Sequence, residues 1–298
     1  ADLGLIACPG AEELCKLVDS HLVRWAREVG NTDVDTFIIP SDCPRFQSGD
    51  AKGLVKASTR GDDLYIFVDP GNYSVTYQLF GYENHLSPDD HFQNLMRLIQ
   101  AVAGRAHRIS VIMPSLYGGR QHRRVSRESL DCAFALQQLR DVGVKNIITF
   151  DAHDPRVMNA VPTMSFDNVM PTYQVLKCLL HHVPDVSFHK DNFMIVSPDE
   201  GAMNRNMYYS SVLGCNLGMF YKRRDYSRIV NGRNPIVAHE YLGESVQGKD
   251  VFIADDIIAS GESMLDIAYE LKMRGARNIF TCCTFPLFTA GLEKFDKA

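Results

Sequence analysis

The stretch of sequence that decides the fold is Val251-Phe252-Ile253-Ala254-Asp255-Asp256-Ile257-Ile258-Ala259-Ser260-Gly261-Glu262-Ser263-Met264. Its apolar, β-branched start predicts a buried strand that ends in two carboxylates, and a loop of small residues then leads into a periodic helix. Loop amides and a helix N-terminus hold phosphate, while carboxylates at a strand's end face sugar hydroxyls or a metal. This order predicts a site for a phosphorylated sugar. The alternative is a solvated turn whose acidic residues cap the helix.

Composition excludes several classes of protein. Of the 298 residues, 45% are hydrophobic, which is ample for one or two buried cores. The net charge of -5 gives no reason to expect nucleic acid or an anionic membrane as partner. No apolar run approaches the roughly 20 residues that a membrane helix needs. None of the eight cysteines forms a C-x-x-C motif, so we expect reduced thiols and a cytoplasmic protein.

Apolar runs and helical periodicity alternate along the chain. Strands are expected at 3–8, 36–39, 64–68, 109–114, 146–150, 193–197, 217–221, 251–256 and 278–285, and helices at 11–29, 89–103, 126–142, 169–182, 204–213 and 264–274. Segments 71–88 and 223–249 are polar and are expected to be irregular. This alternation predicts an α/β fold with mostly parallel sheets. Two halves of similar rhythm, 1–160 and 161–298, indicate two domains.

Residues 113–128 form a basic stretch that follows an apolar strand. Guanidinium groups such as that of Arg120 form paired hydrogen bonds with phosphate oxygens, so this stretch is a candidate triphosphate site. Its alternative is a solvated basic loop.

Other polar residues also lie where predicted strands end. His153 stands between Asp151 and Asp154, a setting that favours function over the structural role of most isolated histidines. Asp199 follows the strand at 193–197, where it could equally cap the next helix. The charged segment 220–228 and the segment 45–50 could each be no more than an exposed turn.

Taken together, the segments described above occur in the same order as in the ribose-phosphate pyrophosphokinase family and resemble its motifs. The resemblance extends from about residue 3 to residue 291. Arg120-Gln121 matches the nucleotide-binding pair of the family's Tyr-Ala-Arg-Gln-Asp-Arg-Lys loop, and residues 151–154 resemble its Asp-Leu-His-Ala segment. Ser197-Pro198-Asp199 matches the start of Ser-Pro-Asp-x-Gly-Gly, and residues 222–224 match Lys-x-Arg. Residues 45–50 resemble Arg-Phe-x-Asp/Asn-Gly-Glu, which holds adenine from a neighbouring subunit.

The resemblance implies a role for each of these segments. Ribose 5-phosphate would lie on Asp255, Asp256, Ala259, Ser260, Gly261, Glu262 and Ser263. ATP would lie on Phe46, Ser48, Asp50, Arg120, Gln121 and His153. The metal ligands for Mg²⁺ would be His153 and Asp199, since carboxylates, waters and phosphates suffice for this ion. Lys222 and Arg224 would be the catalytic pair, in a loop that closes over the phosphates and stabilises the transition state.

The implied fold is two similar phosphoribosyltransferase-like domains, each a mostly parallel sheet flanked by helices. The implied reaction transfers pyrophosphate from Mg-ATP to the C1 hydroxyl of ribose 5-phosphate, giving phosphoribosyl pyrophosphate and AMP. Adenine contacts between subunits imply a homodimer or a hexamer.

Some positions depart from the family pattern. Ala259 stands where many members have a third Asp, His122 replaces an Asp, Asp154 replaces an Ala, and Glu262 stands where Gly is common. The family usually adds a strand and a helix after the segment matching 285–291, so we expect a truncated second domain.

Two alternatives stay open. One is a non-catalytic regulatory homologue, against which the presence of Lys222, Arg224, His153 and Asp199 speaks. The other is a phosphoribosyltransferase, which needs neither the Arg120-Gln121 loop nor a duplicated domain.

Overall fold

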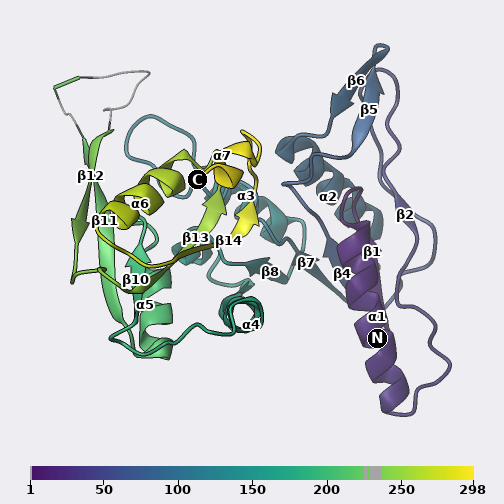
Figure 1. Ribbon diagram of the computed structural model, residues 1–298. Helices are drawn as coiled ribbons and strands as arrows, with labels where there is room; N and C mark the ends of the chain where they lie inside the picture. The colour runs from purple at the N-terminus through teal and green to yellow at the C-terminus, as the bar shows by residue number, and fades with distance from the viewer. Residues whose placement is uncertain (1, 225–226, 229–235) are drawn as a thin grey trace. The chain divides into compact units, whose positions relative to one another are not determined.

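A computed structural model describes residues 2–224, 227–228 and 236–298. The chain divides into two compact units, Ala1–Val169 and Met170–Ala298 (Figure 1). The expected boundary after residue 160 lies ahead of β9 (Ser165–Val169). Since β9 pairs in parallel with β8 (Asn146–Phe150), it belongs to the first unit.

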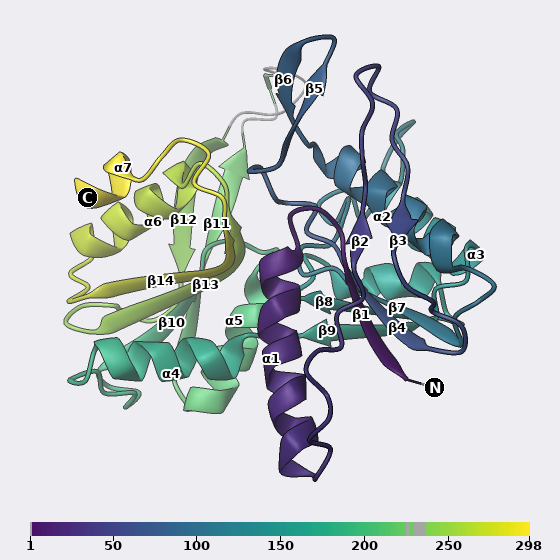
Figure 2. The same cartoon turned by 90° about the vertical axis from the view of Figure 1, so that its right-hand side faces the viewer.

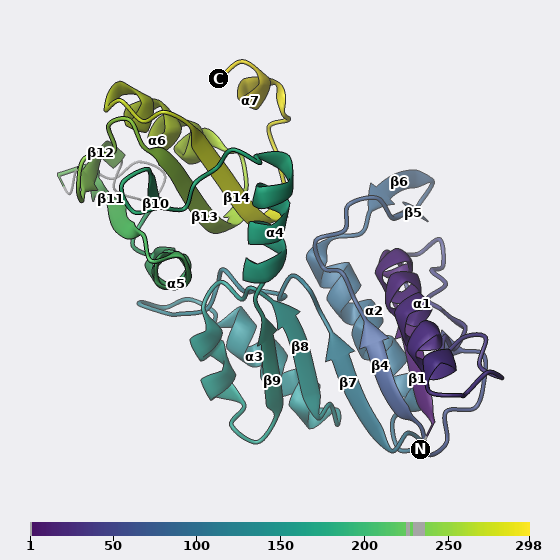
Figure 3. The same cartoon turned by 60° about the horizontal axis from the view of Figure 1, so that its bottom comes forward.

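The first unit contains a sheet of five parallel strands in the spatial order β1, β4, β7, β8 and β9 (Figure 3). The first three are β1 (Leu3–Ala7), β4 (Asp63–Phe67) and β7 (Arg108–Ile112). The helices are α1 (Glu12–Glu28), α2 (Pro88–Val102) and α3 (Asp131–Asp141), with a short 3-10 helix η1 (Pro155–Ala160). Leu5 and Phe67 pack toward α1, while Ile6 and Leu64 pack toward α2 and α3. Both faces of the sheet are therefore covered.

Smaller elements of the first unit differ from the sequence expectations. The expected strand at 36–39 is reduced to one bridge between Leu5 and Ile38, and the short strands β2 (Ser41–Asp42) and β3 (Leu54–Val55) follow. The segment 71–88, expected to be irregular, contains the hairpin β5 (Thr76–Leu79) and β6 (Tyr82–His85) (Figure 2). Its two-residue turn has φ of 49° at Phe80 and 82° at Gly81, as tight hairpin turns require.

The second unit also contains a five-stranded sheet, in the order β12, β11, β10, β13 and β14. Its strands are β10 (Phe193–Ser197), β11 (Asn216–Arg224), β12 (Ile236–Leu242), β13 (Asp250–Ile258) and β14 (Ile279–Pro286). Its helices are α4 (Thr172–His182), α5 (Met203–Leu213), α6 (Glu262–Met273) and α7 (Glu293–Asp296). Val251 and Ile253 pack against α6, whereas Phe252 and Ala254 face the core formed with α4 and α5. Two α/β units with mostly parallel sheets confirm the predicted fold class.

One strand and two element boundaries were predicted wrongly. β12 pairs antiparallel with β11 inside the segment expected to be irregular. α3 begins at Asp131 and not at residue 126. β13 does not end at its two carboxylates but continues to Ile258, where it is still paired with β14, whereas β10 pairs with it only to Phe252. Asp255 and Asp256 therefore lie within β13, past its last pairing with β10.

Among the described residues, none of the helices combines the length and the apolar character needed to cross a lipid bilayer.

Candidate functional site

The two adjacent carboxylates of β13 have different surroundings. Successive side chains of a strand point to opposite faces; Asp256 is only 4% exposed, whereas the Asp255 side chain is 23% exposed. The Asp255 carboxylate accepts a hydrogen bond of 2.8 Å from the backbone N–H of Asp256. Burial raises the pKa of Asp255 to about 7, and the neighbouring Asp256 and Asp199 act in the same direction. A carboxyl group in this state is typical of a binding or catalytic site.

The loop after β13 has the backbone that a phosphate site needs. Gly261 has a φ of 84° and is the N-cap of α6, so this position favours glycine. Ala259 and Ser260 are half-buried, while Glu262 and Ser263 are exposed in the first turn of the helix. The backbone N–H groups at the start of α6, together with its dipole, provide an anion-binding end.

The segment around α7 packs against this loop. A Cβ atom on Gly261 would lie 2.3 Å from Cζ of Phe295, so the ring closes directly over the glycine. Lys294 forms an ion pair of 2.8 Å with Glu262, which lowers the pKa of that carboxyl. The charge of Glu262, which stands where the family commonly has Gly, is therefore balanced by the ammonium group of Lys294 in the same unit.

Asp199 and Lys222, predicted for different roles, lie in contact. Asp199 follows β10, and its Oδ1 accepts a hydrogen bond of 3.1 Å from the backbone N–H of Ala202. Its Oδ2 lies 3.0 Å from Nζ of Lys222, which projects from β11. Both side chains are partly exposed, so the pair is open to exchange with a ligand. Arg224 ends β11, and its side chain lies outside the described part of the structure.

Two residues at this site were missed by sequence reasoning. Arg205 lies on α5 with Nη1 4.0 Å from Oδ1 of Asp255, and its side chain is only 9% exposed. Asn206, also on α5, is fully buried and hydrogen-bonds the backbone of Ala254. The available signal was a pair of polar residues in the first turn of a helix that directly follows Ser-Pro-Asp.

The predicted adenine residues of the first unit lie on one closed loop. Phe46 and Asp50 are joined by a backbone hydrogen bond of 2.7 Å, and the hydroxyl of Ser48 donates to Asp50 at 2.9 Å. Phe46 is 53% exposed, and the Lys52 ammonium lies over its ring at 5.9 Å from the centroid, so stacking of this ring on a base stays a prediction. The structure thus brings Phe46, Ser48 and Asp50 together at the surface of this unit.

Arg120 and Gln121 differ in how much of each is available to a ligand. Arg120 is exposed. The side-chain amide of Gln121 serves the backbone: its oxygen accepts from the N–H of Asp131 at 2.6 Å, and its nitrogen donates to the carbonyl of Arg123 at 3.3 Å. Gln121 therefore closes the loop that precedes α3, and a contact with a nucleotide stays a prediction.

Comparisons with known proteins match both halves of the chain. The model of the N-terminal domain of ribose phosphate pyrophosphokinase matches residues 3–143, and that of the phosphoribosyl transferase domain matches residues 181–295. The chain belongs to the ribose-phosphate pyrophosphokinase family.

Relatives and a solved structure agree with this membership. The chain is 26% identical to the ribose-phosphate pyrophosphokinase of Ralstonia nicotianae over 251 residues, which cover 83% of this chain and 70% of the relative. It is 25% identical to that of Staphylococcus epidermidis over 291 residues, covering 97% of this chain and 79% of the relative. A crystal structure of phosphoribosylpyrophosphate synthetase from Mycobacterium smegmatis matches 96% of this chain and 82% of its own with a TM-score of 0.75, at 19% identity. At that identity the likeness shows the fold.

The two departures from the pyrophosphokinase pattern in the first unit face each other. Nε2 of His122 lies 3.5 Å from Oδ2 of Asp154, and the ring of His122 lies 5.2 Å from that of His153. Hydrogen bonds from Arg156 lower the pKa of Asp154 to about 2, and burial lowers the pKa of His122. His122 replaces the family's Asp and Asp154 replaces its Ala, and the two new residues interact with each other. One carboxylate, that of Asp154, therefore remains next to His153.

The described residues offer limited ligands for a metal ion. No three His, Cys, Asp or Glu side chains among them lie close enough together to hold one. Mg²⁺ that arrives with a nucleotide needs only one or two carboxylates, because waters and phosphate oxygens complete its shell. The Asp199 carboxylate has the right chemistry, whereas the imidazole of His153, in the first unit, suits transition metals better. Mg²⁺ on these two residues therefore stays a prediction.

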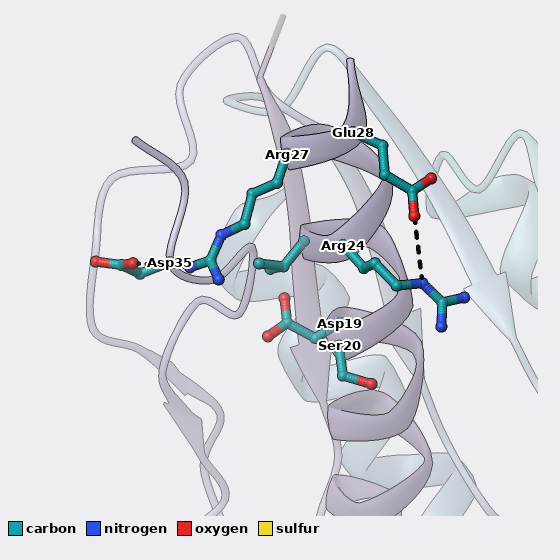
Figure 4. A pocket seen from close by; sticks show the side chains of 7 residues that line it. Asp19, Ser20, Arg24, Arg27, Glu28 and Asp35 are labelled. Atoms are coloured by element: carbon teal, nitrogen blue, oxygen red, sulfur yellow. Dashed lines mark hydrogen bonds and ion pairs between the residues drawn. The ribbon is translucent and has the colours of Figure 1, made fainter. Parts of the chain in front are cut away.

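A hollow of about 690 Å³ lies along α1, away from these residues in the sequence (Figure 4). Arg24 pairs with Glu28 at 3.9 Å, Arg27 pairs with Asp35 at 3.3 Å, and Asp19 accepts from the backbone N–H of Phe37. Its described lining includes none of the predicted site residues. Both arginines of the hollow therefore pair with carboxylates that also line it.

Proposed function

We propose that the chain is a ribose-phosphate diphosphokinase that transfers pyrophosphate from Mg-ATP to the C1 hydroxyl of ribose 5-phosphate. The observation that carries the proposal is the end of β13, where a desolvated carboxylate precedes a glycine-capped helix N-terminus. The match to a pyrophosphokinase N-terminal domain supports this reaction over that of a phosphoribosyltransferase.

In the proposed reaction, the C1 hydroxyl oxygen of ribose 5-phosphate bonds to the β-phosphorus of ATP. The bond between that phosphorus and the oxygen that bridges the α- and β-phosphates breaks. AMP leaves with the bridging oxygen, and the hydroxyl proton passes to solvent. Asp255 and Asp256 orient the ribose hydroxyls, and the loop at 259–263 holds the 5-phosphate. Lys222 exchanges Asp199 for the phosphates and, with Arg224, neutralises the charge that develops on them.

The first unit binds ATP in this proposal. Phe46, Ser48 and Asp50 hold adenine, and Arg120, Gln121 and His153 address the triphosphate. Mg²⁺ that arrives with the nucleotide would be held by the Asp199 carboxylate, with waters and phosphate oxygens completing its shell, and would supply charge neutralisation at the phosphates. A cytoplasmic homodimer or hexamer, in which the adenine loop serves a neighbouring subunit, completes the proposal.

A non-catalytic regulatory homologue is the second candidate. It is favoured by the engagement of Gln121 with the backbone and by the His122–Asp154 pair, both at the ATP side.

Activity of the purified chain decides between the two. With ribose 5-phosphate and Mg-ATP, we expect AMP and phosphoribosyl pyrophosphate in equal amounts, measured by ion-exchange chromatography. Lys222→Ala should lower kcat about 100- to 1,000-fold with little change in ribose 5-phosphate affinity, because the ammonium acts in the transition state. Lys249→Ala is the matched control, since Lys249 pairs only weakly with Glu244 at 4.0 Å. If the wild type releases no AMP, the regulatory homologue is the remaining candidate. If Lys222→Ala loses ribose 5-phosphate affinity as much as it loses kcat, the role of Lys222 in the transition state is refuted.

A further inference from the structure

The first turn of α5 carries two polar residues that none of the sequence motifs covers. α5 begins at Met203, shortly after β10 and Asp199. It packs against β10, β11 and β13, so its side chains reach the strand that bears the acidic pair. Arg205 and Asn206 make this connection.

Asn206 takes the place of a missing strand neighbour. β10 pairs with β13 only as far as Phe252, so the backbone of Ala254 has lost that partner. The amide of Asn206 replaces it in both directions: Nδ2 donates to the carbonyl of Ala254 at 2.7 Å, and Oδ1 accepts from its N–H at 3.1 Å. Buried backbone groups need such partners. The bond pair fixes α5 to the residue immediately before Asp255.

Arg205 places its guanidinium group near the carboxyl group of Asp255, the residue after Ala254. Its Nη1 lies 4.0 Å from Oδ1 of Asp255, and both side chains are largely withdrawn from water, at 9% and 23% exposed. Attraction between charges is screened less at such sites than at the surface. Burial raises the pKa of Asp255, and its two acidic neighbours, Asp256 and Asp199, act in the same direction. The guanidinium of Arg205 is thus placed to attract one oxygen of Asp255 and to fix the direction in which this carboxyl group points.

We propose that Arg205 is a positioning residue that holds the Asp255 carboxylate in place to accept hydrogen bonds from the vicinal hydroxyls of a sugar phosphate. Asn206 supports it by locking α5 to β13. The inference rests on the proposed function, because it takes ribose 5-phosphate as the ligand of Asp255. An ionised carboxylate accepts through both oxygens, so one group can serve two neighbouring hydroxyls.

The test compares arginines at the two ends of β13. Arg205→Gln in the full chain should weaken ribose 5-phosphate binding, measured by calorimetric titration, about 10- to 100-fold, as expected for losing a charged partner. The KM for ribose 5-phosphate should rise while that for ATP stays unchanged. Arg205→Lys should recover part of the affinity, because lysine restores the positive charge but lacks the planar guanidinium group with its paired N–H donors. Arg277→Gln, which removes the partner of Asp250, is the control and should lower the melting temperature without changing sugar affinity.

A double variant separates positioning from direct contact. If Arg205 acts through Asp255, Arg205→Gln should add no further loss of affinity to Asp255→Asn. Additive losses, or wild-type affinity in either Arg205 variant, would overturn the inference. Should Arg205→Gln fail to fold, Arg205→Lys carries the same measurement. A wild type that does not bind ribose 5-phosphate refutes the proposed function and the inference together, whereas binding that is indifferent to Arg205 refutes the inference alone.

Discussion

The two ends of β13 carry the same residue type in opposite electrostatic states. At the amino end, Asp250 is 3% exposed and accepts hydrogen bonds of 2.8 and 2.6 Å from Arg277 and of 3.0 Å from Asn278. The bonds from Arg277 lower its pKa. At the carboxyl end, Asp255 faces Arg205 at 4.0 Å, and burial raises its pKa to about 7.

This difference separates a carboxylate whose oxygens are saturated with hydrogen bonds from one that keeps acceptor capacity. The oxygens of Asp250 are saturated by a bidentate guanidinium and an amide, so its charge stabilises the fold. Asp255 is desolvated with less compensation, which costs free energy in the unliganded protein and leaves acceptor capacity for a ligand. We therefore call the Asp250 end of β13 its closed end and the Asp255 end its open end.

The largest expected effect tests the closed end. Asp250→Ala should lower the free energy of unfolding by about 2–3 kcal/mol, because it removes a buried carboxylate that accepts two charge-assisted hydrogen bonds from Arg277 and one hydrogen bond from Asn278. Urea denaturation measures the change. Asp35→Ala is the control: its ion pair with Arg27 is exposed, so the change should stay below about 1 kcal/mol. Equal losses in the two variants would show that Asp250 is no more structural than a surface carboxylate.

The next largest effect is the pH dependence of stability that Asp255 causes at the open end of β13. The folded pKa of Asp255, about 7, lies above its ordinary value of 3.8, so its contribution to stability is full below about pH 4 and is lost as the pH rises through 7. Asp255→Asn should therefore stabilise the unliganded protein by about 1–2 kcal/mol at pH 8 and by much less at pH 4.

Thermal and urea unfolding between pH 4 and pH 8 would measure this difference. Asp250→Asn is the matched control with the opposite sign, because a lowered pKa contributes stability that is present at high pH and lost as the pH falls. A destabilised Asp255→Asn variant at pH 8 would contradict the distinction between the two ends.

The smallest effect concerns the loop that follows the open end. Glu262 and Lys294 are 65% and 53% exposed, so Lys294→Gln should change stability by about 0.5 kcal/mol or less. It should weaken ribose 5-phosphate binding a few-fold, since an unmatched carboxylate then lies beside the phosphate. Glu262→Gln combined with Lys294→Gln should restore the affinity in calorimetric titrations. Unchanged binding in the single variant would mean that Glu262 does not sense the phosphate.

Some elements of the fold were predictable because their signals are local. Long periodic segments such as α1, α2 and α6 were placed within a few residues, as were the buried strands β1, β8 and β10. β9 was missed because its sequence, Ser165–Val169, alternates polar and apolar residues only weakly. β12 was missed although its sequence, Ile236–Leu242, is mostly apolar, because the polar residues on both sides of it favoured an irregular segment. α3 starts late because Gln121 bonds the N–H of Asp131 and closes the preceding loop.

The sequence by itself determined the α/β class, the two-part plan and the loop of residues 259–263, because these depend on neighbouring residues and on the backbone preference of Gly261. Only the tertiary structure decided which polar side chains meet. Arg205 faces Asp255, Asn206 binds Ala254 across 48 positions, Lys222 pairs with Asp199, and His122 pairs with Asp154. Whether a carboxylate is structural or available to a ligand depends on its burial and on charges from other elements. Those quantities exist only once distant segments have packed together.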